Sequence, residues 1–256
     1  MTSSRILAAL GLASVLVGTS LGDTARSTPK PAKPDADMAA VLDALGKLGG
    51  KPIETLTPDE ARKEPTPVDA VKAVLRARHR SASDPVDEVE DRTYKGASGA
   101  EIPLRIYTPI GNGPLPVILY FHGGGWVIGN LDLDDATPRA LANRTGAIVV
   151  SASYRQAPEH KFPAAHDDAF EAYRWVLANT TLIHGDLTRI AIAGEGAGGN
   201  LALGTVIRAR EEKLPLPAYM VLVYPIAGAD MTTPSYVANA TARPLDKPMM
   251  AWFFEQ

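Results

Sequence analysis

The sequence contains no cysteine, and this absence excludes several kinds of chemistry. Disulfides, thiolate nucleophiles, cysteine-ligated zinc and lipid attachment to an N-terminal cysteine all need a thiol. Charge of one sign is not in excess either, because the 256 residues carry a formal net charge of -3. Proteins that bind nucleic acid usually concentrate Lys and Arg on a strongly basic face. We therefore expect no nucleic-acid partner, and a composition that is 45% hydrophobic and 21% charged is typical of a globular domain.

The N-terminus lacks an apolar run long enough to cross a bilayer, which takes about 20 residues. Its run at residues 6–17 follows a lone arginine and ends in small residues, with Ser20 and Gly22 placed where a signal peptidase cleaves. Residues 1–22 therefore predict a signal peptide, a secreted or periplasmic protein, and no stable membrane insertion after cleavage. An uncleaved anchor is the alternative, and the Gly and Ser content disfavours it. Residues 23–36 are rich in Pro, Lys, Ser and Thr, which predicts a disordered linker.

The remaining residues, 37–256, predict one α/β domain. Apolar residues at helical spacing and a capping box from Thr57 to Glu60 indicate helices within residues 37–85, which we expect to form a cap. Residues 86–256 begin with two hairpin-like strands and then alternate strands with helices, which favours a mostly parallel twisted sheet with helices on both faces. The expected helices cover residues 38–48, 68–80, 135–145 and 167–179, and the expected strands cover 86–94, 102–106, 116–121, 147–150, 190–193 and 218–224.

Three consecutive glycines follow the expected strand at 116–121. Gly123, Gly124 and Gly125 come after His122, at the strand end where ligands bind in open α/β sheets. Backbone N–H groups in such a turn face a substrate oxygen without obstruction by side chains, which is how an oxyanion hole is built. A plain glycine-rich turn is the alternative interpretation.

The chain lacks a serine where its strongest catalytic pattern needs one. An apolar strand at 190–193 leads into Gly194 and then into a helical pattern that includes Leu201. A nucleophile elbow, G-x-S-x-G, has this context, because small residues on both sides let the central side chain stand on a strained turn. The central residue here is Gly196, so the pattern predicts a serine-hydrolase elbow without its hydroxyl group.

Three blocks of sequence resemble one known family. They are HGGGWVIGNLDLDD at 122–135, SYRQAPEHKFPAAHDDA at 153–169 and GEGAGGNLA at 194–202. With these blocks, residues 37–256 are similar to the hormone-sensitive-lipase-like family of α/β hydrolases, which includes bacterial carboxylesterases. The resemblance implies the α/β-hydrolase fold, a small-molecule ester substrate with a short- to medium-chain acyl group, and no metal or organic cofactor. A peptidase or amidase on the same fold fits these motifs equally.

The resemblance also implies roles for the residues that match the family's motifs. Gly196 occupies the position of the nucleophile. The backbone donors of the oxyanion hole match Gly124, Gly125 and Ala197, and Gly123 shapes the turn that carries two of them. Residues that brace the site match His122, Tyr154 and Glu195.

Two departures limit what the resemblance implies. The five histidines all precede position 196, whereas the fold orders its triad as nucleophile, acid and then histidine. Asp230 and Asp246 lie downstream, but neither stands in a block that resembles the family's acid motif. We expect a C-terminally incomplete form of a longer esterase, lacking the last strands of the sheet and inactive as written. The alternative is a genuine pseudoenzyme that binds a small molecule without hydrolysing it.

Overall fold

The structure is a computed structural model that describes residues 33–256. The expected signal peptide and residues 23–32 of the expected linker therefore lie outside the described residues. Residues Pro34–Gln256 form one compact unit. Its first helix begins at Ala36, inside the range expected to be linker, and Asp35 caps this helix by accepting a hydrogen bond from the N–H of Met38 at 2.7 Å. Helical structure thus begins one residue before the expected start of the domain.

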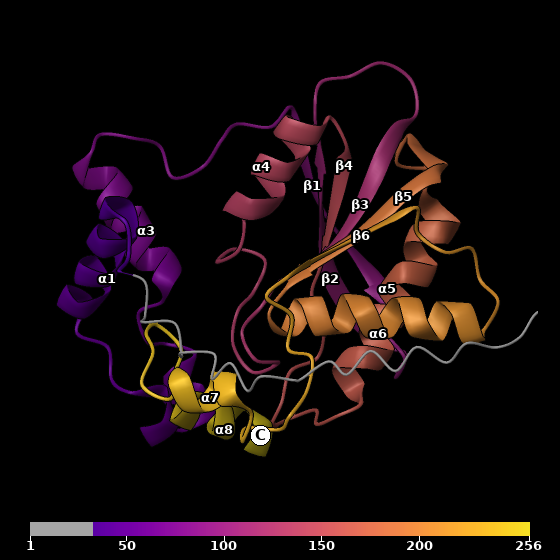
Figure 1. Cartoon of the computed structure of the whole chain (residues 1–256). Coiled ribbons are helices and arrows are strands. Elements are labelled where there is room, and N and C mark those ends of the chain that lie inside the picture. Colours follow the sequence, from indigo (N-terminus) through magenta and orange to yellow (C-terminus); the bar gives the residue numbers. More distant parts are fainter. Residues whose placement is uncertain (1–32) are drawn as a thin grey trace, which may run out of the picture. The chain divides into compact units, whose positions relative to one another are not determined.

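A six-stranded sheet lies at the centre of this unit, in the order β1-β2-β4-β3-β5-β6 (Figure 1). β1 pairs antiparallel with β2, and β2 pairs antiparallel with β4, while the other neighbours pair in parallel. The predicted opening hairpin and mostly parallel sheet are therefore confirmed. The strands are β1 (Glu88–Lys95), β2 (Glu101–Thr108), β3 (Leu115–Phe121), β4 (Ile148–Ala152), β5 (Gly185–Glu195) and β6 (Tyr219–Val223).

Helices connect several of the strands, and further helices precede β1 and follow β6 in the chain (Figure 1). The helices expected at 38–48, 68–80, 135–145 and 167–179 are confirmed, with boundaries that differ by up to three residues. The helical pattern expected after the elbow is confirmed as α6 (Ala197–Glu211). Two helices after the last predicted strand, α7 and α8, were missed. The helices are α1 (Ala36–Leu48), the short 3-10 helix η1 (Ile53–Thr55), α2 (Pro58–Ala61), α3 (Pro67–Ala77), α4 (Ala136–Thr145), α5 (Ala164–Asn179), α6 (Ala197–Glu211), α7 (Pro234–Ala238) and α8 (Lys247–Glu255).

The two faces of the sheet follow the alternation of side chains along a β-strand. In β3, Val117, Leu119 and Phe121 belong to the large core that contains residues of α5 and α6, whereas Tyr120 lies in a smaller cluster with Ala142 of α4. Figure 1 shows α5 and α6 on one side of the sheet and α4 on the other. Helices therefore cover both faces, as predicted, and the carboxyl ends of the parallel strands point to a common edge.

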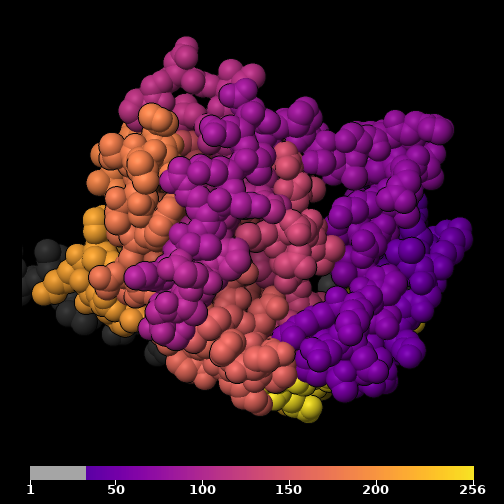
Figure 2. All heavy atoms as spheres, turned by 180° about the vertical axis from the view of Figure 1, so that it is seen from behind, coloured from indigo at the N-terminus to yellow at the C-terminus, as the bar shows by residue number. Residues whose placement is uncertain are grey.

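Local capping chemistry sets the beginning of the N-terminal helices. The N–H of Thr57 donates to Glu60 at 2.9 Å and the N–H of Glu60 donates to Thr57 at 3.4 Å, which confirms the predicted capping box. Thr66 and Asp69 repeat this arrangement at the start of α3. α1 packs on α3, and Figure 2 shows this N-terminal region in indigo on one flank of the unit.

β6 is an edge strand and exposes apolar side chains. Tyr219 is 70% exposed, Val221 is 44% exposed and Val223 is 43% exposed. Within residues 33–256, no strand pairs with the outer edge of β6. An apolar edge of this kind favours pairing with a further strand.

Candidate functional site

The turn between β5 and α6 has the geometry of a nucleophile elbow, although no side chain stands on it. Gly196 has φ 52° and ψ -115°, a conformation that residues with a side chain rarely adopt. A β-carbon added there would meet no atom within 4 Å, so the position has room for a side chain. At Gly194 or Gly198 a β-carbon would overlap backbone atoms. Close backbone approach therefore requires both flanking glycines, and the strained turn is retained without the serine.

The glycine turn after β3 lies against this elbow. The carbonyl oxygen of Glu195 is 3.2 Å from the place where a β-carbon on Gly123 would stand. Gly124 and Gly125 have φ values of 103° and 59°, and neither position has room for a β-carbon. The turn closes where the N–H of Val127 donates to the carbonyl oxygen of Gly124 at 3.1 Å. The sequence uses glycine here both for a positive φ and for close packing.

Backbone N–H groups of the two turns remain without an acceptor in the part of the chain that the structure describes. They belong to Gly123, Gly124, Gly125, Trp126 and Ala197. Ala197 is the first residue of α6, where the helix dipole adds positive partial charge. Free N–H groups in a glycine turn and at a helix N-terminus bind an oxygen that carries negative charge. The structure therefore brings the predicted oxyanion-hole residues to adjoining turns, and their catalytic role stays a prediction.

His122 is buried and braces the glycine turn. Its Nδ1 lies 2.7 Å from the carbonyl oxygen of Gly123. Burial lowers the pKa of His122 to about 4, so near neutral pH the ring is uncharged and we assign the proton to Nδ1. The 3.9 Å contact between Nδ1 and Asp134 is therefore not an ion pair. The hydroxyl group of Tyr154 donates to the carbonyl oxygen of His122 at 3.0 Å, and the two rings stack with centroids 4.7 Å apart.

Two carboxyl groups lie close to the glycine turn: that of Glu195, which the sequence blocks indicate, and that of Asp134. Glu195 accepts a hydrogen bond from the hydroxyl group of Tyr224 at 3.1 Å. Asp134 was missed because the local pattern does not show which aspartate of its loop points inward. Burial, and after it the charge of Glu195, raises the pKa of Asp134 to about 7. The negative charge beside the turn therefore changes near neutral pH.

Other residues of the second sequence block join segments around the site. Asp168 is fully buried and accepts hydrogen bonds from the Nε of Arg155 at 2.7 Å and from the N–H of Ala97 at 3.1 Å. His166 Nε2 lies 2.8 Å from the side-chain oxygen of Asn200, one turn into the elbow helix. These contacts connect α5 to the β1–β2 turn and to α6.

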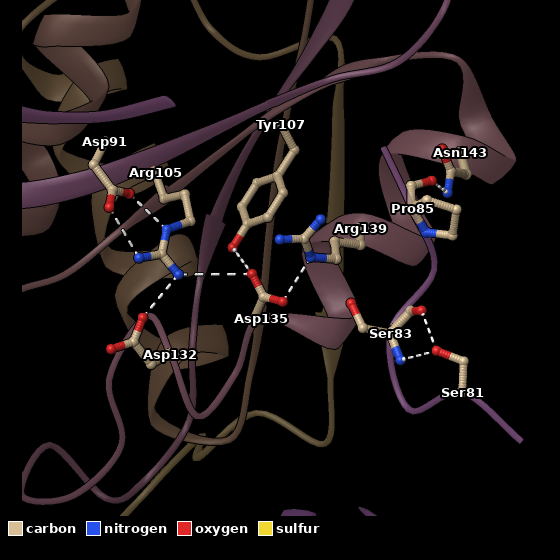
Figure 3. A network of polar contacts seen from close by, with 10 residues as sticks. All are labelled: Ser81, Ser83, Pro85, Asp91, Arg105, Tyr107, Asp132, Asp135, Arg139 and Asn143. Carbon is tan, nitrogen blue, oxygen red and sulfur yellow. Dashed lines mark hydrogen bonds and ion pairs between the residues drawn. The ribbon is translucent and has the colours of Figure 1, made fainter. Parts of the chain in front are cut away.

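A network of charges anchors the loop that follows the glycine turn (Figure 3). Arg105 of β2 pairs with Asp91 of β1 at 3.0 Å and with Asp132 of the loop at 2.9 Å. The hydroxyl group of Tyr107, also in β2, donates to Asp135 at 2.9 Å. The sheet thus holds both ends of the segment 132–135, which carries the half-buried Asp134.

The described residues offer neither a metal centre nor a membrane span. Within residues 33–256, no group of three or more His, Asp and Glu side chains is arranged to hold a metal ion. No helix in the same part of the chain is both long and apolar enough to cross a bilayer. The groups that the two turns present are backbone N–H donors and carboxyl groups.

Comparison with known sequences agrees with this geometry. A family model described as alpha/beta hydrolase fold matches residues 118–256. Carboxylesterase NlhH of Mycobacterium tuberculosis is 41% identical over 198 residues, which cover 73% of this chain and 62% of the relative. Ethyl acetate hydrolase of Pseudomonas putida is 33% identical over 229 residues, which cover 86% of this chain and 70% of the relative. The chain thus spans less than two thirds of the length of the first of these relatives.

Solved structures give the same result. A hyperthermophilic esterase from the archaeon Pyrobaculum calidifontis matches with a TM-score of 0.77 and 36% identity, over 89% of this chain and 70% of that chain. The family model covers more than half of the sequence and includes the glycine turn and the elbow. The chain therefore belongs to the α/β hydrolase fold family, which confirms the resemblance of its sequence blocks.

Proposed function

We propose that the elbow and the glycine turn form the acyl-transfer site of a carboxylesterase acting on short- to medium-chain acyl esters. The observation that carries this proposal is the backbone of Gly196, which keeps a strained elbow conformation and leaves room for a side chain. The names of the relatives, carboxylesterase NlhH and ethyl acetate hydrolase, support the substrate class. As written, the chain has no nucleophilic hydroxyl group at this position, and we expect it to be inactive.

In the proposed reaction, a serine at position 196 attacks the ester carbonyl from the tip of the elbow. The N–H groups of Gly124, Gly125 and Ala197 then stabilise the negative oxygen of the tetrahedral intermediate. Cleavage of the ester C–O bond releases the alcohol and leaves an acyl-serine, which water hydrolyses to the acid and the free serine. His122 does not take the serine proton, because it is fully buried and its Nδ1 is committed to the carbonyl oxygen of Gly123. Its neutral ring holds the turn instead.

The general base that the fold requires after the elbow is not among these 256 residues, since all five histidines precede position 196. Loss of triad members leaves only the catalysis that binding and the oxyanion hole provide. Restoring the serine alone should therefore give this chain far less activity than a complete triad gives.

The test is an assay of Gly196→Ser with p-nitrophenyl butyrate and a panel of longer acyl esters. It is made in the 256-residue chain and in the complete reading frame of the gene. We expect turnover in the complete frame and little in the 256-residue chain. Gly196→Ala is the matched control, because it fills the same space without a hydroxyl group. Failure of the serine variant of the complete frame to hydrolyse any ester would overturn the esterase proposal.

A second candidate function, carboxylate binding without hydrolysis, is favoured by the free N–H groups and by the open space at Gly196. A carboxylate oxygen carries the negative charge that these donors accept, and the missing side chain leaves room beside it. Butyrate is the probe, added to protein with isotope-labelled glycine. We expect it to shift the amide NMR signals of Gly124 and Gly125, and a spectrum unchanged at high butyrate concentration would contradict this function.

We also propose that the protein is exported to the periplasm or the medium, from the layout of residues 1–22 alone. The test is N-terminal sequencing of the protein recovered from an expressing bacterium. Cleavage near Gly22 is expected, and an intact N-terminus on cytoplasmic protein would contradict export.

A further inference from the structure

Arg62, which follows α2, has its whole guanidinium group engaged. Nε donates to the carbonyl oxygen of Val127 at 2.9 Å, and Nη2 donates to the carbonyl oxygen of Ala157 at 2.9 Å. Both terminal nitrogens also bind the carboxylate of Glu159, each at 2.7 Å. A second contact of Nη1 reaches Asp59 at 3.5 Å. One side chain of the N-terminal cap therefore binds two loops that are distant in sequence.

The carbonyl groups that Arg62 binds belong to Val127 and Ala157, and the N–H groups of these two residues are hydrogen-bonded to the glycine turn. The N–H of Val127 donates to the carbonyl oxygen of Gly124 at 3.1 Å. The N–H of Ala157 donates to the carbonyl oxygen of Trp126 at 2.9 Å. A shift of Val127 or Ala157 therefore moves the turn itself.

The glycine turn depends on such contacts from outside. Gly124 and Gly125 have no side chains to restrain them, and without contacts their backbones have large conformational freedom. An ion pair between two exposed side chains would contribute little to the stability of the turn. The Arg62 side chain differs, because it is only 26% exposed and two of its bonds go to backbone carbonyl groups.

Apolar packing accompanies these hydrogen bonds. Ala61, the residue before Arg62, is buried in one cluster with Val127, Ala157 and Phe253. The cap therefore reaches the loops beside the turn through a buried apolar contact as well as through the guanidinium group.

We infer that Arg62 is a positioning residue for the N–H groups that bind the substrate oxygen. By holding the carbonyl groups of Val127 and Ala157, it orients the N–H groups of Gly124 and Gly125. Oxygen binding at the turn thus depends on a docked cap. The inference rests on the proposed function for the identity of the ligand, whereas the orientation of the turn is a property of this chain in either case.

The experiment compares the wild-type chain with Arg62→Met and with the matched control Arg189→Met. Arg189 also pairs with a carboxylate, Asp186, at 2.6 Å and also donates to a backbone carbonyl, that of Pro114, at 2.7 Å. It does so at the beginning of β5, at the opposite end of the strand from the elbow. Each protein carries isotope-labelled glycine and valine, so that the N–H groups of Gly124, Gly125 and Val127 are all observed, and its melting temperature is recorded.

Three readouts at a temperature well below melting separate positioning from general stability. Arg62→Met is expected to change the amide NMR signals of Gly124 and Gly125, to speed hydrogen exchange at the N–H of Val127, and to weaken butyrate binding about tenfold. Arg189→Met is expected to leave all three unchanged even where its melting temperature falls. Millimolar guanidinium added to Arg62→Ala is expected to restore the glycine signals in part.

Unchanged glycine signals and unchanged exchange in folded Arg62→Met would overturn the inference. If Arg62→Met does not fold, Glu159→Gln replaces it, because this variant weakens the hold on Arg62 and leaves both carbonyl groups in place. Smaller changes of the same kind are then expected, and their absence would overturn the inference. Absence of butyrate binding in the wild type would contradict the proposed ligand, while the glycine signals and the exchange rate still decide the role of Arg62.

Discussion

The ring of Phe253 in α8 lies directly on the α-carbon of Gly125. A β-carbon at position 125 would overlap this ring, and Phe253 is only 6% exposed. The neighbouring Trp252 is bonded to the N-terminal segment, since its Nε1 donates to the carbonyl oxygen of Leu56 at 3.1 Å. α8 and the N-terminal cap therefore act jointly to keep the glycine turn in place.

Gly125→Ala is expected to lower the free energy of unfolding by about 2–4 kcal/mol, because it combines a strained positive φ with overpacking against Phe253. Gly146→Ala is the matched control: its φ is 65°, but no atom lies within 4 Å of its β-carbon. This control should lose only about 1 kcal/mol, the cost of the backbone strain alone. Urea unfolding measures both, and equal losses would contradict the packing of Phe253 on the turn.

Gly196→Ser is expected to fold and to lose about 1–2 kcal/mol of stability, the cost of placing a side chain at a φ of 52°. No steric cost adds to this, because the β-carbon meets open space. Thermal and urea unfolding of the serine variant beside the wild type measure the loss. A loss well above that of Gly196→Ala, which has the same backbone strain, would show that the elbow has no room for the nucleophile.

The parts of the site that are made of backbone could be predicted from the sequence. The elbow at Gly196 and the glycine turn at Gly124 have local signatures, because tight turns and close backbone approach require glycine at fixed spacing. The capping box at Thr57 was predictable for the same reason, since both of its partners lie within one helical turn. Local chemistry thus leaves a local pattern.

The side chains that hold these turns in place could not be predicted. Arg62 and Phe253 act on loops that are distant in sequence, and nothing in their own neighbourhoods indicates the partner. The inward position of Asp134 has no local pattern either. Asp134 and Asp132 stand in the same short loop, yet the first side chain is 14% exposed and the second is 83% exposed. Which of them turns inward is decided by tertiary contacts to the sheet, including those of Arg105.

Arg105→Met is expected to lower the free energy of unfolding by about 1–3 kcal/mol, because it removes the charge-assisted hydrogen bonds that the 16% exposed Arg105 makes to Asp91 and Asp132 (Figure 3). The control is Arg92→Met in β1, since Arg92 pairs with Glu90 at 2.7 Å and is more exposed. Its loss should be about 1 kcal/mol or less. Urea unfolding at low and high salt measures both, and a loss at Arg105 no larger than at Arg92 would contradict the anchoring role of the network.

The pH dependence of stability should report the ionisation of the half-buried Asp134. Its pKa of about 7 in the folded protein lies above the ordinary value of 3.8, so between these values the folded state holds a proton that the unfolded state has lost. This group therefore lowers stability as the pH rises from about 4 to about 7, and its cost is constant above that range. His122, with its pKa lowered to about 4, acts in the opposite direction, because its contribution rises with pH up to its ordinary value of 6.5.

Asp134→Asn removes the loss of stability that ionisation of Asp134 causes, and it keeps the gain that comes from the neutral His122. The variant should match the wild type near pH 4 and exceed it by about 1–4 kcal/mol near pH 8, where the wild type must bury an ionised carboxylate. Its stability should also rise more steeply between about pH 4 and 6.5, since the contribution of His122 is no longer offset. Urea unfolding across this range measures both features, with Asp132→Asn as the exposed control in the same loop. A difference between Asp134→Asn and wild type that does not change with pH would mean that Asp134 stays ionised in the folded protein.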